Sequence, residues 1–469
     1  MTAPRKPGIK KIAPKNRSEA ISPARKAAFG VLLAVERGHS HSDDLLRGRA
    51  VDALSAPDRN LATALVLGVL RWQIRLDHQL QALLKHPNAK LEPEVRIALR
   101  IGAFQLLHMD RIPARAAIDE SVELAKQAGH RFASAMVNAV LRKLPVATNA
   151  NVSEDSAVNI ARAAAHPAWM VDRWATFYGL DAARALCHHG QSQPALTLRI
   201  LDAAAADELH AAGVHLEPGE ILNAARAVVS GEVSACAALH DGRVRIQDEG
   251  SQLVAELAGA ACDTPPRSIL DCCAAPGGKT LILAERSPEA KMLACESSLQ
   301  RFDALRERLA PLGERVECRH ADATALPESS AFDLALADVP CSGTGTLGRN
   351  PEIRHRLQLE DLPRQAERQR AILLAALRAI RPGGCVVYST CSMEPEENEE
   401  VVAAVLAEMP NARPISLEAS IESLDRSGLL IPGAAVRLRA SLTTEGALRL
   451  LPGAFHTDGF FVALMERTS

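Results

Sequence analysis

Residues 268–287, SILDCCAAPGGKTLILAERS, constrain the fold of this chain more than any other stretch. They predict a strand, a glycine-containing turn and a helix. Strand–helix alternation continues to the end of the chain, which is typical of a parallel sheet covered by helices on both faces. Open sheets of this kind bind ligands beyond the carboxyl ends of their strands, so the turn after this first strand is a candidate binding loop.

The candidate loop runs from Cys273 to Lys279 and matches neither of two common nucleotide-binding loops. It lacks G-x-G-x-x-G, which disfavours a dinucleotide. Gly278-Lys279-Thr280 matches the end of the phosphate-binding motif G-x-x-x-x-G-K-[ST], but Cys273 stands where its first glycine belongs. Pro276-Gly277-Gly278 still allows close approach of backbone to a ligand, and the helix that follows offers N–H groups.

Acidic residues stand at the ends of the next predicted strands. KMLACE ends at Glu296, VECRH is followed by Asp322, and FDLALAD ends at Asp338. Taken singly, each acid is more often a helix cap or a loop carboxylate than a ligand group. Taken together, they suit a nucleoside that carries an amino acid, with Glu296 at the ribose diol and Asp322 at the adenine edge. The ligand that fits this description is S-adenosylmethionine.

Two cysteines also follow apolar strands: Cys341 in DVPCSGTGT (338–346) and Cys391 in GGCVVYSTCSMEPEENEE (383–400). A lone cysteine is usually an inert small hydrophobe, and this is our interpretation of Cys187, Cys236, Cys262, Cys272, Cys295, Cys318 and Cys385. The ten cysteines are scattered, with no Cys-x-x-Cys and no zinc-site spacing, so we expect free thiols and no metal. The glutamates after Cys391 are expected to cap and begin a helix.

The rest of the chain divides by composition and periodicity. Residues 1–26 carry eight Lys or Arg against one Glu, so an arm at 1–22 either contacts phosphates or only solubilises the chain. Residues 23–146 show helical spacing, and residues 147–159 form a polar linker. Residues 160–235 form a small α/β module, and residues 236–469 form the domain of alternating strands and helices. Neither a bilayer-length apolar run nor a signal peptide is present, so we expect a cytoplasmic protein without membrane contact, and we favour a monomer.

Four motifs, DCCAAPGGKT, DVPCSGTGT, NPEIR and YSTCSMEPEENEE, resemble those of the RNA cytosine-5 methyltransferases in this order. DRNLATALVLGVLR, PARAAIDESVELAK and VNAVLRK resemble the RNA-binding domain of the NusB antitermination factor. The combination resembles the RsmB/Sun/Fmu family of bacterial 16S rRNA cytosine-5 methyltransferases. This resemblance implies a multidomain chain: an all-α NusB-like domain, a small α/β module and a Rossmann-like α/β methyltransferase domain. Its partners would be S-adenosylmethionine and unassembled or partly assembled 16S rRNA.

The resemblance also implies roles for individual residues. Cytosine C5 is a weak nucleophile, and addition of a thiolate at C6 activates it. The RNA enzymes attack with the thiol of the Thr-Cys motif, which is Cys391 here, and Cys341 would assist release. DNA cytosine-5 methyltransferases instead use a Pro-Cys thiol, which would nominate Cys341. Asp338 would hold the N3/N4 edge of the cytosine. The implied cofactor contacts are Cys273, Ala274, Ala275, Pro276, Gly277, Gly278, Lys279, Glu296 (more often Asp in the family), Asp322 and Asp338.

The target base must leave its stack to reach these thiols, so a single-stranded or loop nucleotide is expected. Arg349, Arg354 and Arg356 either steer RNA phosphates or form a solvated helix face. Two other functions are considered. A non-catalytic, antitermination-like RNA-binding protein is disfavoured by the intact cysteines and glycine loop. A DNA cytosine-5 methyltransferase is disfavoured by the second cysteine and the helical N-terminal domain.

Overall fold

The computed structural model describes residues 21–38, 41–88, 90–144, 153–262 and 264–468. The chain forms two compact units, Met1–Asn151 and Val152–Ser469. The expected basic arm at 1–22 lies almost wholly outside the described residues, as does the first part of the expected linker at 147–159. Among the described residues, no helix combines the length and apolarity needed to cross a bilayer.

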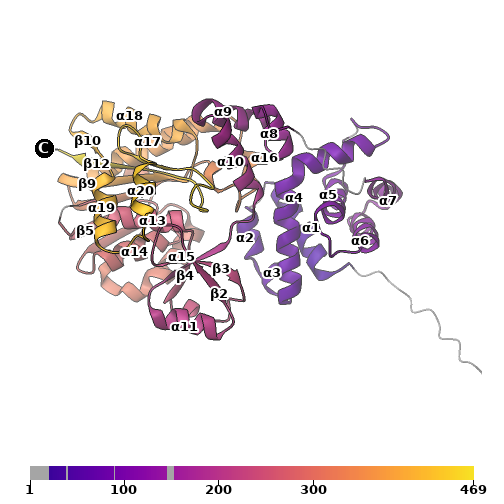
Figure 1. Cartoon of the computed structure of the whole chain (residues 1–469), viewed down its shortest axis with the longest axis horizontal. Helices are drawn as coiled ribbons and strands as arrows, with labels where there is room; N and C mark the ends of the chain where they lie inside the picture. The colour runs from indigo at the N-terminus through magenta and orange to yellow at the C-terminus, as the bar shows by residue number, and fades with distance from the viewer. Residues whose placement is uncertain (1–20, 39–40, 89, 145–152, 263, 469) are drawn as a thin grey trace, which may run out of the picture. The chain divides into compact units, whose positions relative to one another are not determined.

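The first unit is helical (Figure 1, indigo to purple). Prolines stand in the first turns of α1, α4 and α5, where a missing N–H costs least. The side chain of Ser55 also caps α4 by accepting from the N–H of Asp58. Its helices are α1 (Pro23–Glu36), α2 (Ser42–Leu46), α3 (Arg49–Asp52), α4 (Ala56–Leu83), α5 (Pro93–His108), α6 (Ala114–Gln127) and α7 (Ser134–Lys143).

Close packing of α4 against α5 centres on one glycine. A Cβ atom at Gly68 would lie 2.0 Å from the ring of Phe104, so a larger residue at this position would displace that ring. Beside this contact, the buried guanidinium of Arg100 pairs with Glu36 at 2.7 Å and with Asp77 at 2.6 Å. Two carboxylates thus satisfy one buried cation, as a buried charge requires.

The second unit begins with three helices and a four-stranded antiparallel sheet of order β2-β3-β1-β4. The helices are α8 (Ala157–Ala163), α9 (Ala168–Tyr178) and α10 (Leu180–Gln191). The sheet contains β1 (Leu196–Ile200), β2 (His215–Pro218), β3 (Ala225–Ser230) and β4 (Val244–Ile246), with α11 (Ala203–Ala211) and α12 (Ala237–His240) between strands. Its last strand lies beyond residue 235, where we had expected the small module to end.

A sheet of eight strands forms the body of the second unit, with seven in the order β10-β12-β9-β8-β5-β6-β7 and β11 paired to β12. The strands from β9 to β7 are parallel, as expected. Strand β12, however, runs antiparallel to β9, and β10 and β11 each pair antiparallel with β12. The sheet is therefore mixed, a common arrangement in large α/β folds. Its strands are β5 (Ser268–Asp271), β6 (Lys291–Glu296), β7 (Val316–His320), β8 (Phe332–Asp338), β9 (Ile380–Thr390), β10 (Ala412–Ile415), β11 (Leu448–Leu450) and β12 (Phe460–Arg467).

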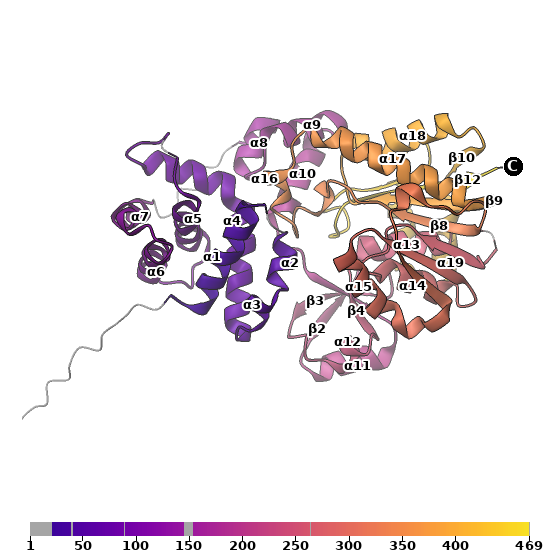
Figure 2. The ribbon, with the colours of Figure 1, turned by 180° about the vertical axis from the view of Figure 1, so that it is seen from behind.

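Helices cover both faces of this sheet, which gives the expected Rossmann-like arrangement. Successive residues of β8 alternate between two apolar cores: Leu334 and Leu336 enter one, Ala335 and Ala337 the other. Figures 1 and 2 show α17 and α18 on one face and α13, α14 and α19 on the other. The helices are α13 (Glu249–Gly259), α14 (Gly278–Arg286), α15 (Leu299–Leu309), α16 (Ile353–Arg356), α17 (Asp361–Ala379), α18 (Glu399–Glu408), α19 (Glu418–Arg426) and α20 (Ala434–Arg439).

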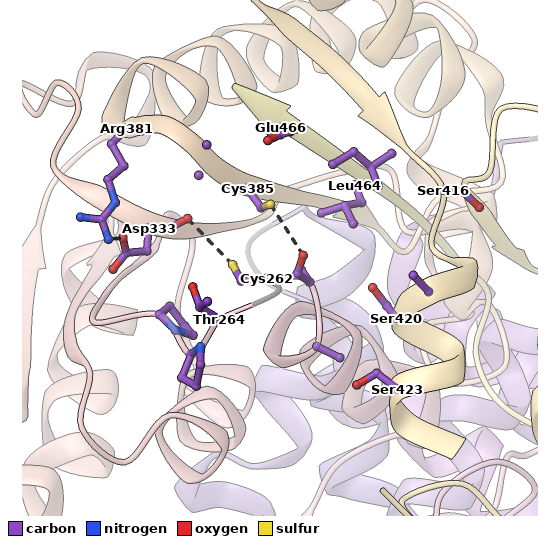
Figure 3. A pocket seen from close by; sticks show the side chains of 18 of the residues that line it. Cys262, Thr264, Asp333, Arg381, Cys385, Ser416, Ser420, Ser423, Leu464 and Glu466 are labelled. Carbon is purple, nitrogen blue, oxygen red and sulfur yellow. Dashed lines mark hydrogen bonds and ion pairs between the residues drawn. The ribbon is translucent and has the colours of Figure 1, made fainter. Parts of the chain in front are cut away.

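The amino ends of the parallel strands border a separate open pocket, shown in Figure 3. Asp333, at the start of β8, is buried there and pairs with Arg381. It also accepts hydrogen bonds from the backbone N–H groups of Arg267 at 2.7 Å and Ser268 at 2.9 Å. These contacts fix the amino end of β5, whereas the candidate ligand loop follows the carboxyl end of the same strand.

Candidate active site

The candidate residues gather at the carboxyl edge of the parallel strands. Strand β5 ends at Asp271, β6 at Glu296, β8 at Asp338 and β9 at Thr390. Because β9, β8, β5 and β6 are neighbours and parallel, these ends lie along one edge of the sheet. This is the edge at which open α/β sheets bind ligands.

The loop between β5 and α14 depends on its glycines. Gly277 has φ of +94°, in the left-handed region that favours glycine, and its N–H donates to the carbonyl of Ala274 at 2.6 Å. A Cβ atom at Gly277 would lie 3.1 Å from Leu305, and one at Gly278 would lie 3.0 Å from Gln247. The loop is therefore held tightly against α15 and against the segment before α13.

Asp338 connects the glycine loop to strand β9. Its carboxylate accepts from the Nζ of Lys279 at 2.7 Å and from the hydroxyl of Ser389 at 2.7 Å. Burial alone lowers the pKa of Lys279, but pairing with Asp338 outweighs it and raises that pKa above its usual range. At the end of β5, burial raises the pKa of Asp271 to about 6, although Thr280 donates to its carboxylate at 2.7 Å.

Two thiols meet beside Asp338. The Sγ atoms of Cys341 and Cys391 are 3.3 Å apart, although the residues are separated by 50 positions in the chain. The hydrogen bond with Cys391, reinforced by burial, raises the pKa of Cys341 well above that of a free thiol. The two sulfurs lie within hydrogen-bonding distance, and the geometry allows either thiol to donate to the other.

A cavity of about 330 Å³ opens in front of these groups, a volume within the range of about 300–1,000 Å³ that small-molecule sites occupy. A second cavity of about 110 Å³ lies against the glycine loop and shares Cys273, Ala275 and Asp338 with the first. The candidate residues that line the first are Cys273, Ala275, Glu296, Asp322, Asp338, Cys341 and Cys391. Those that line the second are Cys273, Ala274, Ala275, Pro276, Gly278, Lys279 and Asp338.

Glu296 and Asp322 line the larger cavity together with the two thiols. Glu296 is almost fully buried, and its carboxylate accepts from the N–H of Ser298 at 2.8 Å. Asp322 caps a short 3-10 helix by accepting from the N–H of Thr324 at 3.0 Å, and this bond lowers its pKa. Asp322 thus serves as a helix cap and lines the cavity as well, so the two interpretations of this acid do not exclude each other.

Several arginines lie where the sequence did not predict them. Arg301 and Arg368 also line the larger cavity, and helical periodicity alone gave no sign of this. Arg354 is buried and donates to the carbonyl of Gly190 at 2.9 Å, so it neither steers RNA phosphates nor belongs to a solvated helix face, the two alternatives that the sequence offered. Arg349 pairs with Asp248 at 2.9 Å and with Asp458 at 2.8 Å, which anchors the segment after Cys341.

Three segments of the chain match known protein families. Residues 262–466 match the family described as 16S rRNA methyltransferase RsmB/F. Residues 22–145 match the NusB family, and residues 166–228 match the ferredoxin-like domain of RsmF/B-like methyltransferases. A probable ribosomal RNA small subunit methyltransferase B from Bacillus subtilis is 33% identical over 459 residues, which cover 94% of this chain and 98% of the relative. The chain belongs to the RsmB/F family of 16S rRNA methyltransferases. The predicted family is confirmed.

Other relatives agree with this RsmB/F assignment. The ribosomal RNA small subunit methyltransferase B of Pseudomonas putida is 33% identical over 84% of this chain and 91% of its own. Among solved structures, PH0851 has a TM-score of 0.77 at 22% identity, covering 96% of this chain and 99% of its own. NSun6 from Pyrococcus horikoshii, solved with SFG, has a TM-score of 0.52 at 18% identity, covering 65% of this chain and 98% of its own. The structural matches confirm the predicted fold.

Proposed function

We propose that this protein transfers a methyl group from S-adenosylmethionine to C5 of a cytosine in 16S rRNA through a covalent adduct between Cys391 and C6. The observation that carries the proposal is the 3.3 Å contact between the Cys341 and Cys391 sulfurs at the mouth of the larger cavity. Two thiols in contact allow one to add to the base while the other handles a proton. A methyltransferase that needed no covalent step would have no use for this pairing.

The donor set of the larger cavity fits S-adenosylmethionine, which supplies the methyl group when bound. In the proposal, Glu296 accepts from the ribose hydroxyls and Asp322 from the exocyclic amine of adenine. The glycine loop provides close backbone approach to the amino-acid end. The SFG that is bound in the NSun6 structure is an analogue of S-adenosylmethionine, which supports this choice of cofactor.

The proposed chemistry uses the two thiols in sequence. The Cys391 thiolate forms a bond to C6 of the cytosine, and the displaced electron pair makes C5 nucleophilic. After C5 has gained the methyl group, its proton passes to solvent. The electron pair of the C5–H bond re-forms the C5=C6 double bond, and the Sγ–C6 bond breaks so that Cys391 leaves as a thiolate. Cys341, whose thiol faces the leaving sulfur, assists this release. Asp338 retains lone pairs beyond those used by Lys279 and Ser389, and holds the N3/N4 edge of the base.

We also propose that the first unit binds the rRNA substrate. Its match to the NusB family over residues 22–145 supports this role, and the basic residues at the start of the chain favour phosphate contact. Recognition would then be shared between a helical RNA-binding unit and a catalytic unit that accepts one unstacked base.

Mapping 5-methylcytosine along 16S rRNA tests the proposed function. RNA from cells that lack this protein should miss one 5-methylcytosine that is present in the parent, and wild-type protein supplied in trans should restore it. A chain carrying Cys391→Ala should not restore it. An unchanged map in cells that lack the protein would contradict the proposal, because it assigns the modification to this enzyme alone.

A substitution in the glycine loop tests the cofactor site. Gly277→Val places a β-branched residue at φ of +94°, with strain of about 1–3 kcal/mol, so we expect S-adenosylmethionine to bind about tenfold or more weakly. Gly383→Val is the matched control, because Gly383 has φ of +79° and borders the pocket at the opposite edge of the sheet. Calorimetry should show weaker binding for the first variant only. Equal affinities in both would show that the loop does not bind the cofactor.

A further inference from the structure

Each of the two candidate catalytic cysteines is followed by a serine, and both serines bind the same buried carboxylate. Glu397 accepts from the N–H of Ser342 at 2.8 Å. Its other carboxylate oxygen accepts from the hydroxyls of both Ser342 and Ser392, which are themselves 3.0 Å apart. One side chain therefore joins the loop that carries Cys341 to the loop that carries Cys391.

The environment of Glu397 is unusual for a carboxylate. The residue is fully buried, and among the described residues no Lys or Arg forms an ion pair with it. It is satisfied instead by hydrogen bonds from the two serines and from the side-chain amide of Gln369, at 2.8 Å. That amide also donates to the carbonyl of Pro340 at 2.9 Å, one residue before Cys341. Burying a carboxylate is costly, so its retention here points to a positional role.

The backbone around Glu397 holds the Cys391 loop from its other side. The carbonyl of Glu397 accepts from the hydroxyl of Tyr388 at 2.5 Å. The neighbouring side chain of Asn398 accepts from the hydroxyl of Thr390 at 2.5 Å and donates to the carbonyl of Ser392 at 2.9 Å. Both residues that flank Cys391 are thus hydrogen-bonded to the same two-residue segment, which leaves the thiol little freedom to move.

We propose that Glu397 is a positioning residue that sets the separation of the two thiols by holding Ser342 and Ser392 on one carboxylate. It lines neither cavity, so it acts through the cysteines and not by contact with RNA or cofactor. Its effect on methylation rests on the proposed function. The thiol separation itself does not, and can be measured without any substrate.

Disulfide formation between Cys341 and Cys391 reports their separation directly. Diamide accepts two electrons and two protons from the pair of thiols, which become a disulfide while diamide becomes the hydrazine. Sulfurs 3.3 Å apart need only a small movement to reach the bonded distance of about 2.05 Å. The rate is followed on the full chain, without RNA or S-adenosylmethionine, by alkylating the remaining thiols and quantifying the Cys341–Cys391 peptide by mass spectrometry.

Glu397→Ala should slow this disulfide formation about tenfold or more, and should lower kcat for methylation about 100-fold with little change in KM, since small misplacements of reacting groups have effects of this size. Glu397→Gln keeps the shape and one acceptor oxygen, so it should recover most of both rates. Asp333→Ala is the control: Asp333 is likewise buried and likewise binds backbone N–H groups, but at the opposite edge of the sheet. It should lower the thermal midpoint and leave the disulfide rate unchanged.

A folded Glu397→Ala chain that forms the disulfide as fast as wild type would overturn the positioning role. If that variant does not fold, Ser342→Ala takes its place, because it removes one hydroxyl and leaves the carboxylate with its other donors; slower disulfide formation supports the role and an unchanged rate refutes it. The proposed function fails on a different result, namely methylation by Cys391→Ala. The two failures are therefore distinguishable.

Discussion

Cys391→Ala is expected to abolish both methylation of rRNA and any covalent complex with it, a loss of at least about 10³-fold in rate, on the scale of removing a catalytic nucleophile. The physical reason is that C5 of cytosine does not take the methyl group until a nucleophile has added at C6. Alanine keeps the small volume of the side chain but forms no such bond.

Transfer of a labelled methyl group to 16S rRNA measures this loss, and denaturing gels detect the adduct. Cys385→Ala is a suitable control, since Cys385 lies on the same strand, β9, but is buried in the apolar core and borders the pocket at the opposite edge (Figure 3). The control should keep its activity while losing some stability. Methylation at wild-type rate by Cys391→Ala would refute the assignment of the nucleophile.

Much of the site could be predicted because parallel strands end at one edge of a sheet. Recognisable apolar runs lead to three of the candidate residues, Glu296, Asp338 and Cys391. These residues come together because their strands belong to one series of neighbouring parallel strands, β9-β8-β5-β6. The helices of the first unit could also be predicted, because their apolar residues recur at helical spacing and prolines mark helix starts. These features are local in sequence, and the fold follows from them.

What could not be predicted depends on contacts between distant segments. The glutamates after Cys391 were interpreted as a helix cap and start, and Glu399 does begin α18. Glu394, however, is buried and accepts from Arg173 and Trp174 of α9, each at 3.0 Å, across more than 200 positions in the chain. Glu397 likewise binds two loops at once. The same charges and spacing would fit an exposed helix start, so the sequence does not distinguish buried glutamates from exposed ones. Only the tertiary contacts make that distinction.

The buried arginine and the antiparallel strands were missed for the same reason. Arg354 lies in a basic run that is typical of a solvated helix face, yet it donates to backbone carbonyls in the interior. The apolar pattern of β12 fits either direction of pairing, because residues alternate between the two faces in parallel and antiparallel strands alike. Its pairing with β9 is decided by the route of the chain through α18, α19 and α20, which periodicity does not encode.

The second large effect concerns Cys341. Cys341→Ala is expected to add to the base and to methylate it once, but to release it slowly, so that the enzyme accumulates as an adduct with RNA through Cys391. Addition and elimination are separate steps, and this substitution removes a group needed only for the second. The Cys341 sulfur lies 3.3 Å from the sulfur that must leave, in the position to assist that departure.

Denaturing gels of the variants with RNA and S-adenosylmethionine decide between the two thiols. A slow-migrating band should appear for Cys341→Ala and be absent from Cys391→Ala and from the double variant. Labelled methyl groups should be present in the trapped band, because the proposed block follows methyl transfer. An adduct that forms only in Cys391→Ala would make Cys341 the nucleophile, as in the DNA enzymes.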